Sequence, residues 1–163
     1  MSEEADLLEL LESTGVLDGF RWANESAARG TLDDYSEDKG HDAGWLGFTR
    51  FTLLRDRTDR FTSCARYEAS EDGSADLGLD VLHEALSRRE IAEMPVVASD
   101  VVRRANLNGS PGWRIADVRI LLASCSYGKV ETLPWPQKSW TKQKVALTPH
   151  LDPQMTLFEG MPE

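Results

Sequence analysis

The fold class follows above all from the segment Asp76-Leu77-Gly78-Leu79-Asp80-Val81-Leu82-His83-Glu84-Ala85-Leu86-Ser87-Arg88-Arg89-Glu90-Ile91-Ala92-Glu93. Four large aliphatic side chains recur in it at the spacing of one helix face: Leu79, Leu82, Leu86 and Ile91. The acids at its start suit the positive end of a helix dipole, and Pro95 prevents a helix from continuing. The pattern therefore predicts a helix over residues 76–93. We interpret His83 as a packed residue of this helix rather than a base or a ligand.

Two further segments are predicted to be helical. Residues 4–13 carry leucines on one stripe, with acids around them, and Gly15 follows as a stop signal. Residues 42–59 begin with Asp42, a good N-cap, and continue with a broad apolar surface. A strand over 48–54 is the alternative there, because Gly44 and Gly47 weaken a helix. The segment ends in charges of both signs, which predict an ion-paired face more than a phosphate contact: Arg50, Arg55, Asp56, Arg57, Asp59 and Arg60.

Strands are predicted on both sides of the helix over 76–93. Alternating side chains indicate strands over 60–69, 96–103, 114–124 and 127–133. Asn108-Gly109 and Pro111-Gly112 are turn signals between them. Residues 16–43 are expected to be mostly irregular, with a short helical turn at 23–29. The sequence thus predicts one compact α+β domain over residues 1–133, with about three helices and a small, mainly antiparallel sheet. An extended arm over 134–149 and a flexible tail over 150–163 follow.

Charge is distributed unevenly along the chain. The net charge is −10 over 163 residues, yet residues 101–150 carry two acids and eight bases. Part of the surface is therefore expected to be basic enough to meet phosphates. The candidate nucleic-acid contacts are Arg103, Arg104, Lys138, Lys142 and Lys144. Trp135 and Trp140 lie among these lysines, where they either stack on exposed bases or fasten the arm to the domain.

The composition also indicates in which cellular compartment the protein is expected. No run of eighteen apolar residues is present, so no membrane span is expected. The acidic start, Met1-Ser2-Glu3-Glu4, is unlike a secretory signal. Cys64 and Cys125 are far apart in sequence and are interpreted as reduced, partly buried thiols. These features lead us to expect a cytoplasmic protein.

An acidic stretch over residues 30–42 is the one candidate for a metal site. It holds five carboxylates, and carboxylate clusters can bind a hard cation such as Mg²⁺. Glu37-Asp38-Lys39 also matches the E-x-K half of a metal-nuclease signature. A nuclease of that type needs this half on a strand, with a separate Asp upstream, whereas the stretch here is predicted to be a loop. We therefore expect a solvated loop without metal.

The segment Gln154-Met155-Thr156-Leu157-Phe158 carries the clearest functional signal. It resembles the peptides that bind the bacterial DNA sliding clamp, in which a Gln is followed, after two variable positions, by Leu and Phe. The resemblance implies that Leu157 and Phe158 enter one hydrophobic pocket and that Gln154 fixes the register through hydrogen bonds. It implies a partner, the sliding clamp, and no reaction. The alternative is that Leu157 and Phe158 pack back on the domain.

The leading expectation is a protein without catalytic residues or a cofactor. It would be an accessory protein of bacterial DNA replication, repair, mobile elements or phage defence, recruited to the clamp by residues 154–158. Two alternatives stay open. One is a small metal-dependent nuclease tethered by the tail, which would use Asp33, Asp34, Glu37, Asp38 and Lys39. The other is a structural subunit of a larger complex. Cleavage that depends on a divalent ion separates the nuclease from the leading expectation.

Overall fold

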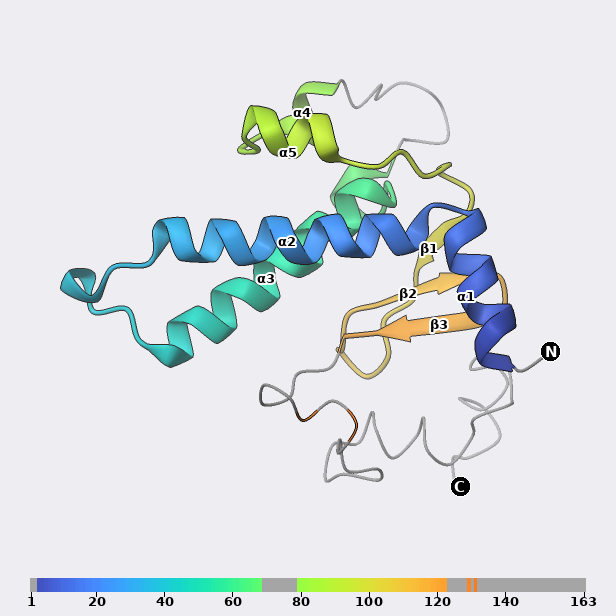
Figure 1. The fold of residues 1–163 in the computed structure, drawn as a ribbon, viewed down its shortest axis with the longest axis horizontal. Helices are drawn as coiled ribbons and strands as arrows, with labels where there is room; N and C mark the ends of the chain where they lie inside the picture. The colour runs from blue at the N-terminus through green and yellow to red at the C-terminus, as the bar shows by residue number, and fades with distance from the viewer. Residues whose placement is uncertain (1–2, 69–78, 123–128, 130, 132–163) are drawn as a thin grey trace, which may run out of the picture. The chain divides into compact units, whose positions relative to one another are not determined.

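The computed structural model describes residues 3–68, 79–122, 129 and 131, and Figure 1 shows their arrangement. By its contacts the chain divides into two compact units, residues 1–103 and 104–163. The first unit holds the helices α1 (Glu3–Ser13), α2 (Val16–Asp34), α3 (Ala43–Phe61), α4 (Leu79–His83) and α5 (Arg88–Glu93). It also holds two 3-10 turns, η1 (Glu37–Lys39) and η2 (Ala65–Tyr67). The strands β1 (Val102–Arg104), β2 (Gly112–Ile115) and β3 (Val118–Leu121) follow. The predicted α+β class is confirmed.

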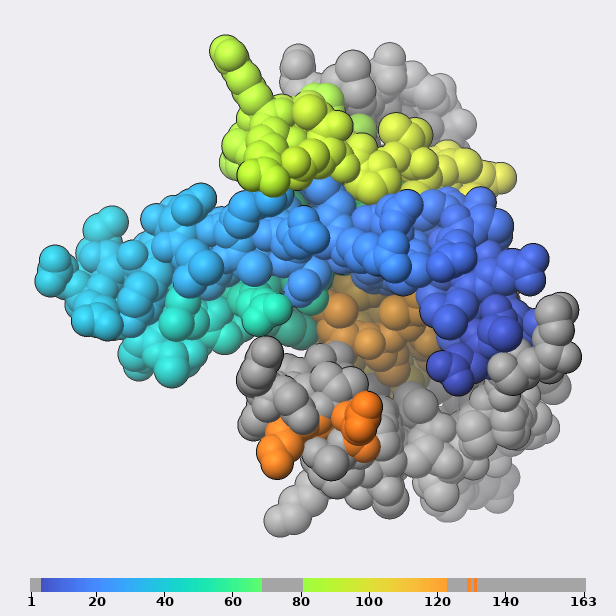
Figure 2. Space-filling view, viewed as in Figure 1, coloured from blue at the N-terminus to red at the C-terminus, as the bar shows by residue number. Residues whose placement is uncertain are grey.

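Helices α2 and α3 form a long hairpin, whose closed end projects past α4 and α5 (Figure 1, Figure 2). The predicted helix over 42–59 is confirmed, and Asp42 caps it by accepting a hydrogen bond from the Trp45 amide at 2.8 Å. The helix over 4–13 is confirmed as α1. The expectation of an irregular segment over 16–43 is wrong, since α2 runs for 19 residues.

The buried stripe of α2 explains why the sequence pattern concealed it. Its members recur at helical spacing, but most are small: Val16, Gly19, Trp22, Ala23, Ser26, Ala27 and Thr31. Small side chains let α3 approach closely, and they give a weak hydrophobic signal. Gly19 makes room for the ring of Phe61, which packs edge-on against Phe20 with ring centroids 5.6 Å apart.

The predicted strand over 60–69 is also wrong. Helix α3 continues to Phe61, and the chain then turns through Ser63 and Ala65, which have positive φ angles of 53° and 54°. The turn η2 follows. Cys64 is buried here and is a free thiol, as predicted. Its Sγ lies 3.6 Å from the carbonyl oxygen of Val102.

The predicted helix over 76–93 is two short helices in the part that the structure describes. Helix α4 ends at His83, and Ala85 adopts a positive φ of 59°. Ser87 then starts α5 with a capping box: its side chain accepts from the Glu90 amide, and the Glu90 carboxylate accepts from the Ser87 amide at 2.8 Å. The apolar periodicity of residues 79–91 is real, but a strong start signal at Ser87 interrupts it.

The strands form a three-stranded sheet in the order β1-β2-β3. Strands β2 and β3 pair antiparallel, with Gly112 opposite Leu121 and Ile115 opposite Val118. The predicted single strand over 114–124 is therefore wrong, because the chain reverses at Ala116-Asp117. The predicted turn at Asn108-Gly109 is confirmed, with φ angles of 48° and 79°. Of the predicted strand over 96–103, only the end forms β1, and Val96 is 94% exposed.

Several predictions lie outside the described residues: most of the strand over 127–133, the arm over 134–149 and the tail over 150–163. Among the helices that the structure describes, none has the length and apolar character needed to cross a membrane.

Candidate functional site

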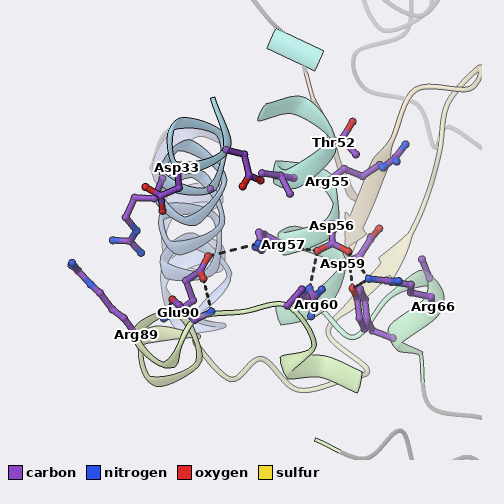
Figure 3. A pocket seen from close by; sticks show the side chains of 18 residues that line it. Asp33, Thr52, Arg55, Asp56, Arg57, Asp59, Arg60, Arg66, Arg89 and Glu90 are labelled. Carbon is purple, nitrogen blue, oxygen red and sulfur yellow. Dashed lines mark hydrogen bonds and ion pairs between the residues drawn. The ribbon is translucent and has the colours of Figure 1, made fainter. Parts of the chain in front are cut away.

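The first unit contains a charged cleft. It has a volume of about 960 Å³ and lies between α2, α3, η2 and residues 85–90 (Figure 3). Six arginines and five carboxylates line it: Arg29, Asp33, Asp34, Arg55, Asp56, Arg57, Asp59, Arg60, Arg66, Arg89 and Glu90. The size is that of a small-molecule site, but the lining holds far more charged residues than is usual for one.

Asp56 is the centre of the cleft's hydrogen-bond network. One carboxylate oxygen accepts from Arg57 Nη1 and from Arg60 Nε, each at 2.7 Å. The other accepts from the Tyr67 hydroxyl at 2.6 Å and from Arg66 Nη2 at 3.2 Å. Four donors saturate a carboxylate, which has about four lone-pair positions. Asp56 is therefore a structural acceptor with no position left for a substrate proton.

Arg57 joins α3 to both neighbouring helices. Its Nε donates to Ser26 Oγ of α2 at 2.9 Å, and its Nη2 lies 3.7 Å from Glu90 of α5. Ser26 in turn donates to the same Glu90 carboxylate oxygen. Trp22 of α2 adds a hydrogen bond from its indole nitrogen to the Glu90 carbonyl oxygen at 3.0 Å. Figure 3 shows Arg57 between Asp56 and Glu90, so one guanidinium bridges two carboxylates.

Arg60 attaches the α4 segment to the same network. Its Nη1 donates to the Leu82 carbonyl oxygen at 2.6 Å, which provides a partner for a helix-end carbonyl. The guanidinium groups of Arg60 and Arg66 each lie 4.8 Å from the centre of the Tyr67 ring. Tyr67 is thus held by two cations and by its hydrogen bond to Asp56.

The electrostatics agree with a network that is ionised and paired. Burial raises the pKa of Asp56, but hydrogen bonds from Tyr67 and Arg60 outweigh it, and the net pKa lies below its ordinary value. Glu90 behaves alike: burial raises its pKa, and the bonds from Ser26 and Ser87 lower it by more. Burial and the bond to Asp56 raise the pKa of Tyr67. None of these groups has the elevated acid or lowered base pKa that proton transfer near neutral pH requires.

Arg55 differs from the other arginines of the cleft. It is half-buried, and its side chain makes no hydrogen bond or ion pair with any residue that the structure describes. Arg66 and Arg89 are 62% and 69% exposed in their side chains, although each has a carboxylate partner. A partner could reach these three guanidinium groups and also that of Arg29, whose side chain is 34% exposed.

The predicted nucleic-acid residues fall in two places. Arg103 and Arg104 form the end of β1, and the Arg103 side chain is exposed. Arg104 is engaged within its own unit, because its Nε donates to Asn106 at 2.8 Å and its guanidinium lies 4.6 Å from the centre of the buried Trp113 ring. Lys138, Lys142, Lys144, Gln154, Leu157 and Phe158 lie outside the described residues.

Glu37-Asp38-Lys39 lies on the 3-10 turn η1 and not on a strand. The strand that the nuclease alternative requires is therefore missing at these residues. In the described ranges, 3–68 and 79–122, no group of three or more His, Cys, Asp or Glu side chains is close enough to hold a metal ion.

The sequence predicted an ion-paired face over residues 50–60 but not that part of it is buried. The predicted ion pairs are confirmed, yet Arg57 and Arg60 are only 6% and 3% exposed. The role of Ser26 and Glu90 was missed altogether. One local signal was available, since Ser87 followed three residues later by Glu90 is the pattern of a capping box.

Comparisons of this chain with protein-family models, with curated proteins and with solved structures find no match. The function is therefore inferred from the residues themselves.

Proposed function

We propose that this chain is a non-catalytic accessory protein of bacterial DNA replication, repair, mobile elements or phage defence. Residues 154–158 recruit it to the DNA sliding clamp, which places it in the bacterial cytoplasm. The observation that carries the proposal is the pattern of Gln154, Leu157 and Phe158. Two adjacent apolar anchors and one amide form a short peptide signal that can act without a large rigid surface.

The charged cleft supports a body without catalysis. Its central carboxylate, Asp56, accepts four hydrogen bonds, and its pKa is shifted away from the range of a general acid or base. The nuclease alternative receives no support from η1, where Glu37 and Lys39 are on a turn. We therefore assign the body to binding and positioning.

A second contact to DNA is part of the proposal. Residues 101–150 carry a local net charge of +6, and Arg103 is exposed at the end of β1. Simultaneous contact with clamp and DNA would raise the affinity through effective concentration. Alanine at Lys138, Lys142 and Lys144 is expected to flatten the salt dependence of DNA binding, by up to about one unit of slope for each phosphate that the protein no longer neutralises.

The deciding experiment measures binding of the full chain to a bacterial sliding clamp by calorimetry. We expect a micromolar dissociation constant, about −8 kcal/mol, because ordering a short peptide offsets much of its apolar burial. Leu157→Ala with Phe158→Ala is expected to abolish binding and to leave the melting temperature unchanged. The matched control, Met155→Ala with Thr156→Ala, changes the variable positions and is expected to retain binding. Wild-type chain that does not bind the clamp, or a double variant that unfolds, would refute the proposal.

A further inference from the structure

The first part of α3 carries a large apolar side chain, Phe48, that a helix normally buries. Phe48 is 73% exposed, and Leu32 on the neighbouring helix is 68% exposed. All the buried residues of α3 lie in its last five positions, Arg57–Phe61. The turns that contain Trp45, Phe48 and Phe51 are therefore left partly uncovered by the residues that the structure describes. Phe48 is thus the most exposed aromatic residue of this part of the helix, with the half-buried rings of Trp45 and Phe51 one turn away on either side.

The exposed and half-buried residues of α3 form a defined stripe. Gly44, Phe48, Phe51 and Arg55 recur at i, i+4, i+7 and i+11, which places them on one side of a helix. Leu53 is on a different side and faces α2, since a Cβ added at Gly30 would lie 3.2 Å from its Cδ1. The stripe is thus turned away from the α2 contact, and none of its residues is buried by the part of the chain that the structure describes.

Charge at the two ends of the stripe is opposite. The connection between α2 and α3 exposes five carboxylates and one lysine: Asp33, Asp34, Glu37, Asp38, Asp42 and Lys39. At the other end is Arg55, whose side chain makes no hydrogen bond or ion pair with the residues that the structure describes. The same surface therefore carries an acidic end, an apolar centre and a basic end.

We propose that two copies of this chain pair through this stripe, antiparallel and about a twofold axis at Phe48. In such a pairing Phe48 meets Phe48 of the second copy, and Trp45 comes opposite Phe51. The acidic connection of each copy then comes opposite Arg55 of the other. A surface that is acidic at one end and basic at the other is complementary to itself when reversed, which is the requirement for a twofold interface. Gly44 beside Phe48 permits close approach of the two helices.

The test measures the oligomeric state of the full chain by light scattering after size-exclusion chromatography, over a range of concentrations. We expect the mass of two chains for the wild type and of one chain for Phe48→Glu. The matched control is Val96→Glu, which places the same charge at an apolar residue that is 94% exposed but outside the stripe. It is expected to remain a dimer. Circular dichroism checks that both variants stay folded.

The charges give a second test that is independent of the apolar contact. Arg55→Glu places acid opposite acid, and Glu37→Lys with Asp38→Lys places base opposite base, so each variant is expected to dimerise at least tenfold more weakly than the wild type. Mixing the two variants restores both attractive contacts and is expected to give a mixed dimer. A wild-type monomer at all concentrations, or a mixture that stays monomeric, would overturn the proposal. No clamp is present in either assay, so this result is separate from that of the clamp test.

Discussion

Two parts of α3, residues 43–56 and residues 57–61, differ in burial. Apolar residues are usually buried and charged ones exposed, but here the opposite holds. Residues 43–56 include Trp45, Phe48 and Phe51, and none of this part is buried. The last five residues include Arg57, Asp59 and Arg60, and all five are buried. The same helix therefore leaves three aromatic residues exposed or half-buried and buries three charged ones.

The contrast indicates that available partners govern burial. Arg57 and Arg60 can be buried because acceptors on α2, α3, the α4 segment and α5 meet their donors. A buried charge without such partners would cost several kcal/mol, roughly 3–5 on removal of one member of a buried pair. The first part, residues 43–56, lies where the hairpin projects past α4 and α5, so no described element of the first unit covers its outer side (Figure 1).

The largest expected effect comes from removing the carboxylate that the buried arginines share. Asp56→Ala leaves Arg57 and Arg60 buried without their shared acceptor, and we expect a loss of about 3 kcal/mol in the free energy of unfolding. For a chain of this size that corresponds to a fall of roughly 6–12 °C in melting temperature. Urea unfolding measures it. Asp18→Ala, which removes an exposed partner of Arg21, is the control and should cost less than about 1 kcal/mol. Equal losses in the two variants would show that the Asp56 network is not special.

The next effect tests the close contact between α2 and the end of α3. In Gly19→Ala the added methyl group would overlap the Phe61 ring, so we expect a loss of about 1–3 kcal/mol despite the better helix propensity of alanine. The double variant Gly19→Ala with Phe61→Leu should be more stable than the sum of its single variants predicts. If the stability change of the double variant equalled the sum of the two single changes, measured by thermal unfolding, the contact between Gly19 and Phe61 would be contradicted.

A smaller change of opposite sign is expected in the first part of α3. Gly47 is helical, and nothing lies within 4 Å of a Cβ added there. Gly47→Ala is therefore expected to stabilise the protein by up to about 1 kcal/mol, through helix propensity alone. Calorimetry of Gly47→Ala and Gly19→Ala compares the change in melting temperature for the same substitution at an exposed and at a packed position of a helix. A destabilised Gly47→Ala would mean that another surface contacts this position.

The smallest change is the response to mild acid. Because the folded pKa of Asp56 lies below its ordinary value of 3.8, its ionised form stabilises the fold above that pH. This contribution is lost as the pH falls below about 4 and through the folded pKa. The Asp56→Ala variant should therefore lose less stability than the wild type over that range, as measured by urea unfolding at a series of pH values. If the stabilities of the wild type and of Asp56→Ala fell equally with pH, the acid sensitivity would come from other carboxylates, such as Glu90.

The helix α1, the start of α3 and the turn at Asn108-Gly109 were predictable because their signals are local. A leucine stripe, an N-cap at Asp42 and two residues that tolerate positive φ act within a few positions of the chain. Helix α2 and the β2–β3 hairpin were not predictable in this way. The buried stripe of α2 is made of small residues, and Ala116 gives no turn signal although its φ is 49°.

Residue type and short spacing were enough to predict the α+β class, the cap at Asp42 and the acidic connection at residues 33–42. The peptide signal of residues 154–158 stays a prediction. Residue type and short spacing were not enough to predict which part of α3 is buried, or that Ser26, Asp56, Arg57 and Glu90 form one network. Ser26 and Glu90 are 64 positions apart, and no local pattern records their contact. A charge can be buried only where the fold brings acceptors from several elements to it, and that arrangement exists only after the chain has folded.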